Sequence, residues 1–160
     1  MISNTAEYAL RVMAWLAGKA PNSQVSKDIA EGTQVPAPYL AKVIQGLVRA
    51  GMVDAKRGRY GGGVTLAVSP EEITILEVVQ AVDPPHRVKE CPLGPGFHGK
   101  DLCPLHRRLD DAMESVERAL GQTTLAEILA ESSPSRPLCR PESTRSRQPP
   151  PKKRSSSGRR

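Results

Sequence analysis

Aromatic side chains are scarce in this sequence: Phe, Trp and Tyr together make up 3% of the 160 residues, whereas hydrophobic residues of all kinds make up 38%. Any core must therefore be built from Ala, Leu, Val and Ile. No apolar run approaches the roughly 20 residues that span a bilayer, which excludes an integral membrane protein. The N-terminus also lacks a basic segment followed by an apolar stretch and a small-residue cleavage site, so we expect no secretory signal and a cytoplasmic location.

Cysteine is rare as well, with three residues in the whole sequence. An odd number of thiols in a reducing compartment argues against a disulfide framework and favours a role in metal binding or redox chemistry. Cys91 and Cys103 lie in one short stretch, whereas Cys139 lies alone in a polar tail, where we expect it to have no specific role.

Charge is distributed unevenly along the chain. Residues 1–70 contain 8 Lys and Arg against 4 Asp and Glu, residues 71–140 contain 8 against 12, and residues 141–160 contain 7 against 1. A basic segment is either a nucleic-acid surface or an ordinary solvated surface. From residue 133 to 160, 22 of 28 residues are Pro, Ser, Lys or Arg. Such a segment buries too little apolar surface to offset its ordering entropy, so we predict a folded part over 1–132 and a disordered basic tail over 133–160.

Hydrophobic spacing predicts a mainly α-helical fold with one small β-hairpin. Thr5 and Ser26 are the predicted N-caps of the first two helices, and Gly32 is predicted to end the second. The predicted elements are helices over 5–17, 27–31 and 37–49, short strands near 52–53 and 64–68, and helices over 70–83, 106–120 and 124–129. The predicted buried face of the third helix consists of Leu40, Val43, Ile44, Leu47 and Val48.

The order helix, short helix, tight turn, helix and hairpin is that of a winged helix-turn-helix. The second helix of such a pair enters the major groove and presents its N-terminal side chains to base edges. A hydroxyl at the start of the preceding helix, and cations on a Gly-rich hairpin, suit contacts to phosphates or the minor groove. The predicted DNA-contacting residues are Ser26, Ala37, Pro38, Tyr39, Lys42, Lys56, Arg57 and Arg59. The alternative is a three-helix protein-interaction module whose glycines form only a flexible turn.

An enzymatic function is not expected. The glycines at 58–63 follow a strand of a hairpin instead of joining a strand to a helix, so they do not match a dinucleotide fingerprint. Cys103 and His106 are too few groups for catalysis, since no general base, oxyanion donor set or cofactor motif accompanies them.

The helix predicted near the C-terminal end of the folded part carries a heptad-like seam. Its apolar residues are spaced 4, 3 and 4 apart, at Leu109, Met113, Val116 and Leu120. The seam either packs within its own chain or makes a homodimer over about residues 106–121. A homodimer would place two recognition helices on a two-fold DNA site.

A loop over about residues 84–105 contains potential metal ligands. Cys103 and His106, three residues apart, can bind one centre, and the possible set is Cys91, His98, Cys103 and His106. Two thiolates and two imidazoles satisfy tetrahedral zinc as well as an iron–sulfur centre with mixed ligation. The same residues can also be unligated polar groups on a loop.

These motifs together resemble the IscR/NsrR family of bacterial winged-helix transcription regulators (the Rrf-two family). The resemblance runs from about Ile2 to Leu129. It is carried by EYALR at 7–11, IAE at 29–31, VPAPYLAKVIQGL at 35–47, the wing at 57–63, EVVQAVD at 77–83, the Cys loop, and TLAEIL at 124–129.

The resemblance implies a homodimeric regulator, here a repressor, that binds palindromic double-stranded promoter DNA and whose long helix crosses its partner. Many members hold an iron–sulfur cluster and use its loss, oxidation or nitrosylation as the signal. The function implied is therefore DNA-binding regulation in response to redox state, iron–sulfur status or nitric oxide.

The resemblance also assigns cluster ligands residue by residue. Cys91 and Cys103 match the first and third Cys of the family pattern, and His106 matches its His. Phe97 stands where the middle Cys is found, with His98 beside it as a substitute. A further substitute is an acidic residue near the N-terminus that reaches the site from the partner subunit, the position of Glu7. This ligand set favours a two-iron, two-sulfide cluster, and the alternatives are zinc, or no metal with regulation by thiol oxidation or a protein partner.

Overall fold

The computed structural model describes residues 2–56, 58, 62–90 and 102–131. Among these residues, no helix is long and apolar enough to cross a membrane. The elements are α1 (Asn4–Lys19), α2 (Ser26–Thr33), α3 (Ala37–Arg49), β1 (Val53–Lys56), β2 (Gly63–Leu66), α4 (Ile75–Val82), α6 (Pro104–Gly121) and α7 (Leu125–Ala130). The strands form an antiparallel pair in which Val53 faces Leu66 and Lys56 faces Gly63. The predicted fold class, mainly α with a small hairpin wing, is confirmed.

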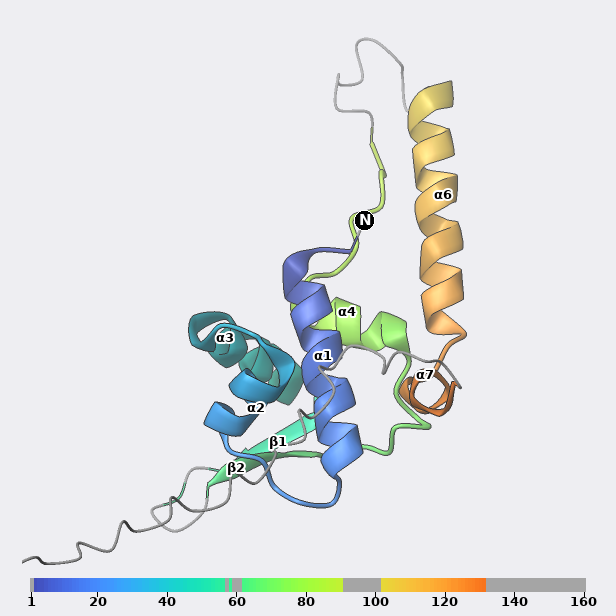
Figure 1. Cartoon of the computed structure of the whole chain (residues 1–160). Coiled ribbons are helices and arrows are strands. Elements are labelled where there is room, and N and C mark those ends of the chain that lie inside the picture. Colours follow the sequence, from blue (N-terminus) through green and yellow to red (C-terminus); the bar gives the residue numbers. More distant parts are fainter. Residues whose placement is uncertain (1, 57, 59–61, 91–101, 132–160) are drawn as a thin grey trace, which may run out of the picture.

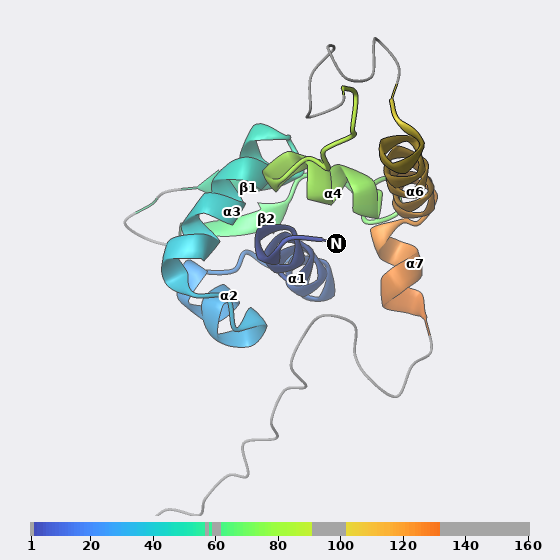
Figure 2. The ribbon, with the colours of Figure 1, turned by 90° about the horizontal axis from the view of Figure 1, so that it is seen from above.

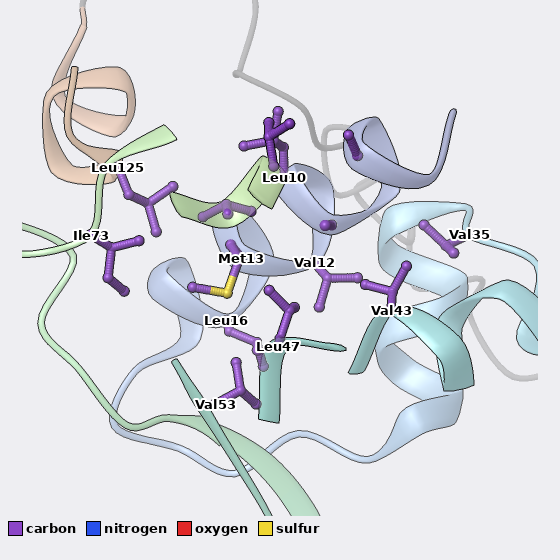
Figure 3. Close-up of a cluster of buried hydrophobic side chains, with 14 of the residues drawn as sticks. Leu10, Val12, Met13, Leu16, Val35, Val43, Leu47, Val53, Ile73 and Leu125 are labelled. Atoms are coloured by element: carbon purple, nitrogen blue, oxygen red, sulfur yellow. The ribbon is translucent and has the colours of Figure 1, made fainter. Parts of the chain in front are cut away.

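A hydrophobic core surrounds α1 (Figure 3), whose buried side chains contact residues from nearly every other element. Leu10, Val12, Met13 and Leu16 of α1 are at most 6% exposed, and they pack with Val43 and Leu47 of α3, Val53 of β1, Ile73 and Leu125. Within the described residues the fully buried set contains no aromatic side chain, so this core consists of aliphatic side chains and Met13, as the composition predicted.

The helices α2 and α3 and the long helix α6 lie on opposite sides of the molecule (Figure 1). In both views α4 lies between α3 and α6 (Figure 2), and α4 contacts α1, α3 and α6. Gly46 permits the close approach of α3 to α4, because a Cβ there would lie 2.9 Å from Cγ1 of Val82. α7 is joined to the segment before α4 by the backbone hydrogen bond from Leu125 N–H to the carbonyl of Ile73.

Three predicted helix ends are wrong, each for a local reason. α1 begins at Asn4, because the Ser3 side chain, not Thr5, accepts from the backbone N–H of Ala6. Ser26 is the first residue of α2 and Val25 is its N-cap. Gly32 lies inside α2, which ends one residue later at Thr33, and Gln34 takes the left-handed conformation that ends a helix (φ 57°).

The segment predicted as a helix over 70–83 contains a turn followed by a shorter helix. α4 begins only at Ile75, because Thr74 and Glu77 form a reciprocal capping box. The pKa of Glu77 is lowered, chiefly by the hydrogen bond from the backbone N–H of Thr74. Thr124 and Glu127 form the same kind of capping box at the start of α7.

Candidate nucleic-acid interface

The N-terminal end of α3 projects from the surface, as expected of a helix that reads DNA. α3 runs over the predicted residues 37–49, and its inner face buries Leu40, Val43 and Leu47 against the core. Ala37, Pro38 and Tyr39 are all exposed, and Tyr39 retains 53% of its accessible surface. The buried face begins at the next residue, Leu40, so the exposed residues 37–39 form the end of the helix that precedes its packed part.

A groove of about 720 Å³ lies between α3 and the hairpin. It brings together three of the predicted DNA-contacting residues from three elements: Ser26 from α2, Lys42 from α3 and Lys56 from β1. Lys42 and Lys56 are exposed. Their two cations beside a concave surface suit a polyanion that runs along α3. Arg57 and Arg59 lie outside the described residues.

The groove also contains residues that the sequence analysis did not assign to an interface. Ala41, Gln45 and Val48 line it, at positions i, i+4 and i+7 of α3. Val48 was predicted to be buried, but it is 39% exposed, because it lies on this outer face. The signal that was available is the helical spacing of Ala41, Gln45 and Val48 around Lys42, which places all four on one side of α3.

Two aromatic rings connect α1 to the N-terminal end of α3. The rings of Tyr8 and Tyr39 meet edge to face, with centroids 5.8 Å apart and planes at 64°. The Arg11 guanidinium carbon lies 5.9 Å from the centre of the Tyr8 ring. Arg11 also pairs with Glu7 one turn earlier on α1. These contacts restrict the orientation of Tyr39, which is otherwise an exposed side chain.

A thiol and an imidazole lie together at the start of α6. Cys103 is the N-cap of α6, and its Sγ is 3.2 Å from Nδ1 of His106 in the first turn. The predicted proximity of these two residues is therefore present. Thiolate sulfur and imidazole nitrogen are both ligands for zinc and for iron–sulfur centres, so the pair fits two positions of such a site.

The other predicted ligands are not part of this pair. Cys91 and His98 lie outside the described residues. Glu7 lies on α1, where its carboxylate pairs with Arg11. Within the residues that the structure describes, no group of three or more His, Cys, Asp or Glu side chains is arranged to hold a metal ion.

Arg87 forms a charged cluster with α6 that the sequence analysis did not predict. Its guanidinium donates to both carboxylate oxygens of Asp110 at 2.7 Å, and to Glu117 at 3.2 Å and Glu114 at 3.4 Å. The backbone N–H of Val88 also donates to Asp110, at 3.0 Å. The hydrogen bond from Arg87 is the main reason that the pKa of Asp110 is lowered, and Asp110 and Glu117 in turn raise the pKa of Arg87.

One face of α6 is apolar and largely exposed. Leu105, Leu109 and Val116 retain 64%, 48% and 47% of their accessible surface, and no residue of α6 is fully buried. Of the predicted seam, Leu120 packs against the core, and Met113 and Val116 line a cavity of about 350 Å³ beside α4. The described chain thus covers one end of the seam and leaves the rest open.

Comparison with known proteins gives matches that cover most of the chain. Residues 2–131 match the sequence model of the Rrf2 family, described as "Iron-dependent Transcriptional regulator". The chain is 38% identical over 136 residues to the HTH-type transcriptional regulator NsrR of Bacillus subtilis, which covers 80% of this chain and 89% of that protein.

Solved structures show the same architecture. The structure of CymR, "the Global Cysteine Regulator of B. subtilis", superposes with a TM-score of 0.65 at 27% identity, covering 83% of this chain and 98% of that one. The structure titled "T. potens IscR" superposes with a TM-score of 0.64 at 28% identity, covering 81% of this chain and 85% of that one.

Proposed function

This chain belongs to the Rrf2 family of transcriptional regulators, and on that premise we propose that it binds double-stranded promoter DNA as a homodimeric repressor. Membership in the family confirms the predicted resemblance. It also confirms that the chain is a regulator and not an enzyme, since the family and the Bacillus subtilis relative are both named as transcriptional regulators.

The observation that supports the DNA interface most strongly is the groove between α3 and the hairpin, with Ser26, Lys42 and Lys56 around it. In this proposal Ala37, Pro38 and Tyr39 face base edges in the major groove. Lys42 and Lys56 neutralise phosphates, and Ser26 donates to the DNA backbone. Arg57 and Arg59, which follow β1 in the sequence, are proposed to reach phosphates or the minor groove on sequence grounds alone.

The exposed apolar face of α6 supports the homodimer. Leu105, Leu109 and Val116 follow one another at helical spacing, and each is at least 47% exposed. A row of large apolar side chains of this kind is typical of an interface between chains. A two-fold pair of α6 helices would hold two copies of α3 at a fixed separation on a palindromic site.

The Cys103–His106 pair supports a regulatory metal centre. We propose that Cys103 and His106 supply two ligands of a two-iron, two-sulfide cluster, that Cys91 supplies a third, and that His98 or the Glu7 of a second copy supplies the fourth. When bound, such a cluster would supply an oxidation state and a lability that respond to redox conditions or nitric oxide. The chain's own residues would hold the start of α6 and so bias the affinity of α3 for DNA.

A cluster-free regulator is the second candidate. The Sγ–Nδ1 contact of 3.2 Å also suits zinc, or a thiol whose oxidation or contact with a protein partner is the signal. The iron, sulfide and zinc content of protein purified without oxygen separates these possibilities.

Salt dependence tests the DNA interface. DNA binding through several phosphates must weaken steeply with added salt, so the affinity of the full-length protein for duplex DNA is measured over a salt series. We expect Lys56→Ala to lower the slope of log affinity against log salt by about one, since it removes one phosphate contact. Lys89→Ala is the matched control: Lys89 is an exposed lysine away from the groove, and the slope is expected not to change. An absence of duplex binding by the wild type at low salt would refute the proposal.

Metal analysis tests the sensor. We expect charge-transfer absorption bands with stoichiometric iron and sulfide in the wild type, and their loss in Cys91→Ala and Cys103→Ala. Cys139→Ala removes the third thiol, which lies in the polar tail, and is expected to retain the bands. A colourless wild type without iron, also after reconstitution, would refute the cluster and leave zinc or thiol sensing.

A further inference from the structure

The position of α6 relative to the DNA-binding core depends on few contacts. α6 has 18 residues and none of them is fully buried. At its C-terminal end it is anchored by Leu120, which packs on the core, and by Gly121, where a Cβ would lie 3.3 Å from Cδ2 of Leu76 of α4. Figure 1 shows the N-terminal half of α6 extending away from the other helices.

Packing alone does not fix the middle of α6. Between it and the end of α4 lies the cavity of about 350 Å³, lined on one side by Val79 and Pro84 and on the other by Met113 and Val116. Side chains that border a cavity have lost part of their mutual attraction, so they resist a tilt of the helix weakly.

Arg87 bridges α6 to the segment that leaves α4. Asp110, Glu114 and Glu117 lie on successive turns along one side of α6, and the single guanidinium contacts all three. Arg87, Asp110 and Glu117 are each 27% exposed or less. Isolated surface ion pairs contribute little to stability. A bidentate arginine–carboxylate pair within a network, in contrast, can fix the relative position of two segments. The Val88 N–H that donates to Asp110 adds a backbone contact at the same point.

From these contacts we propose that Arg87 is a positioning residue that fixes the direction of α6, and with it the spacing of the two DNA-reading helices in a dimer. This inference rests on the proposed dimeric DNA binding. An 18-residue helix is about 27 Å long, so a tilt of about 10° at one end displaces the other by about 5 Å. That displacement exceeds the 3.4 Å rise of one base pair, so a loose α6 would accept half-sites at several spacings.

The same contact places the metal-ligand pair. Cys103 and His106 occupy the start of α6, and Asp110 lies one turn after His106. Because Arg87 holds that second turn, it also determines where the pair stands relative to α3. A change at the pair and a change at Arg87 therefore act on the same rigid element.

The experiment compares full-length Arg87→Met with Arg118→Met. Both replace an arginine by a side chain of similar length and remove one positive charge. Arg118 pairs with Glu114 of its own helix, and among the described residues it forms no ion pair with another segment. Duplexes are built from the half-site that the wild type selects, in a series in which the centre-to-centre spacing changes by one base pair at a time.

We expect wild type and Arg118→Met to favour one spacing by about tenfold or more, a usual size for coupling between sites. Arg87→Met is expected to lose most of this preference while its affinity for a single half-site stays unchanged. Arg87→Lys, which keeps the charge but not the two-pronged contact, is expected to lie between them. Retention of the full spacing preference by Arg87→Met would overturn the proposal.

Hydrogen exchange gives a readout that does not require DNA. The Val88 amide and the amides of residues 108–114 are expected to exchange faster in Arg87→Met than in Arg118→Met, by about tenfold for Val88. If Arg87→Met fails to fold, Asp110→Asn, which keeps the shape of the carboxylate, replaces it. Unchanged exchange would refute the positioning role, whereas faster exchange in a protein that binds no duplex would refute only the proposed DNA binding.

Discussion

α1 and α6 are helices of similar length, but they differ in how much of their surface the rest of the chain buries. α1 has 16 residues, of which seven are buried, whereas α6 has 18 residues and none is fully buried. Both carry apolar residues at helical spacing, so this spacing by itself does not distinguish them. The difference is that α1 lies at the centre of the chain's own core, while most of the apolar face of α6 has no cover within the described part of the chain.

This contrast in burial suggests that the two regions have different roles. The elements around α1 hold α3 and the hairpin in place, and the rigidity of that core fixes which side chains of α3 point outward. α6 contributes little to the core and projects an apolar face, the Cys103–His106 pair and the acidic residues that bind Arg87. We infer that the first region recognises DNA and that the second sets the geometry of the assembly.

The largest expected effect comes from truncating matched leucines in the two helices. Leu16→Ala in α1 removes a side chain that is 2% exposed, so it should lower the free energy of unfolding by about 2–5 kcal/mol. Leu109→Ala in α6 removes one that is 48% exposed, so it should change that free energy by about 0.5 kcal/mol or less. Urea unfolding at a protein concentration too low for self-association measures both.

In an assay of self-association, Leu109→Ala should have the larger effect of the two variants. Sedimentation equilibrium is expected to show weaker self-association for Leu109→Ala, because the proposed interface loses an apolar side chain. Equal losses of unfolding free energy in the two variants would contradict the conclusion that α1 belongs to the core and that the apolar face of α6 does not.

A glycine pair gives an effect of intermediate size within the core. A Cβ at Gly32 of α2 would overlap the Trp15 ring of α1, so Gly32→Ala should destabilise the fold by about 1–3 kcal/mol through overpacking. Gly18 lies in α1 with nothing within 4 Å of such a Cβ, so Gly18→Ala should be neutral or stabilise by up to about 1 kcal/mol. Fluorescence of Trp15, the one Trp in the sequence, reports both unfolding transitions. Destabilisation of the same size in both variants would show that contact with Trp15 is not the cause.

The smallest expected effect is a pH dependence of the α6 contact. The Arg87 hydrogen bond lowers the pKa of Asp110 in the folded protein, so its contribution is complete above the ordinary Asp value of about 4. The contribution is lost as pH falls through the lowered folded value. Glu114 and Glu117 contact the same guanidinium. Protonation of Asp110 weakens its contact with Arg87, so α6 should be held less firmly in acid.

The measurement is the difference in unfolding free energy between wild type and Asp110→Asn. This difference is expected to be largest at neutral pH and to shrink as pH falls below about 4. Asp111→Asn, an exposed neighbour, is the control and should stay within about 0.5 kcal/mol of wild type at neutral pH. A difference that does not depend on pH would show that the negative charge of Asp110 contributes nothing to stability.

Local patterns made part of this structure predictable from the sequence. The bounds of α3 follow from helical periodicity between Pro36 and Gly51, and the contact between Cys103 and His106 follows from their spacing of three. Gly32 was wrongly predicted to end α2, because its role is to make room for Trp15, a contact between helices that local sequence does not reveal.

Long-range contacts were the part that sequence reasoning missed. Arg87 meets Asp110, Glu114 and Glu117 across 23 to 30 positions, and no periodicity connects residues so far apart. Val48 was misplaced for a related reason. Its spacing fits the edge of the buried face of α3, and only the position of the hairpin decides that it lines the groove.

The central claim is that the core recognises DNA and that α6 joins two copies on a two-fold site. The most direct test is selection by the full-length wild-type protein from a pool of random duplexes. We expect enrichment of an inverted repeat whose half-sites are one helical turn, about 10 base pairs, or a multiple of it apart. No enrichment, or enrichment of a single half-site without its inverted copy, would contradict the account.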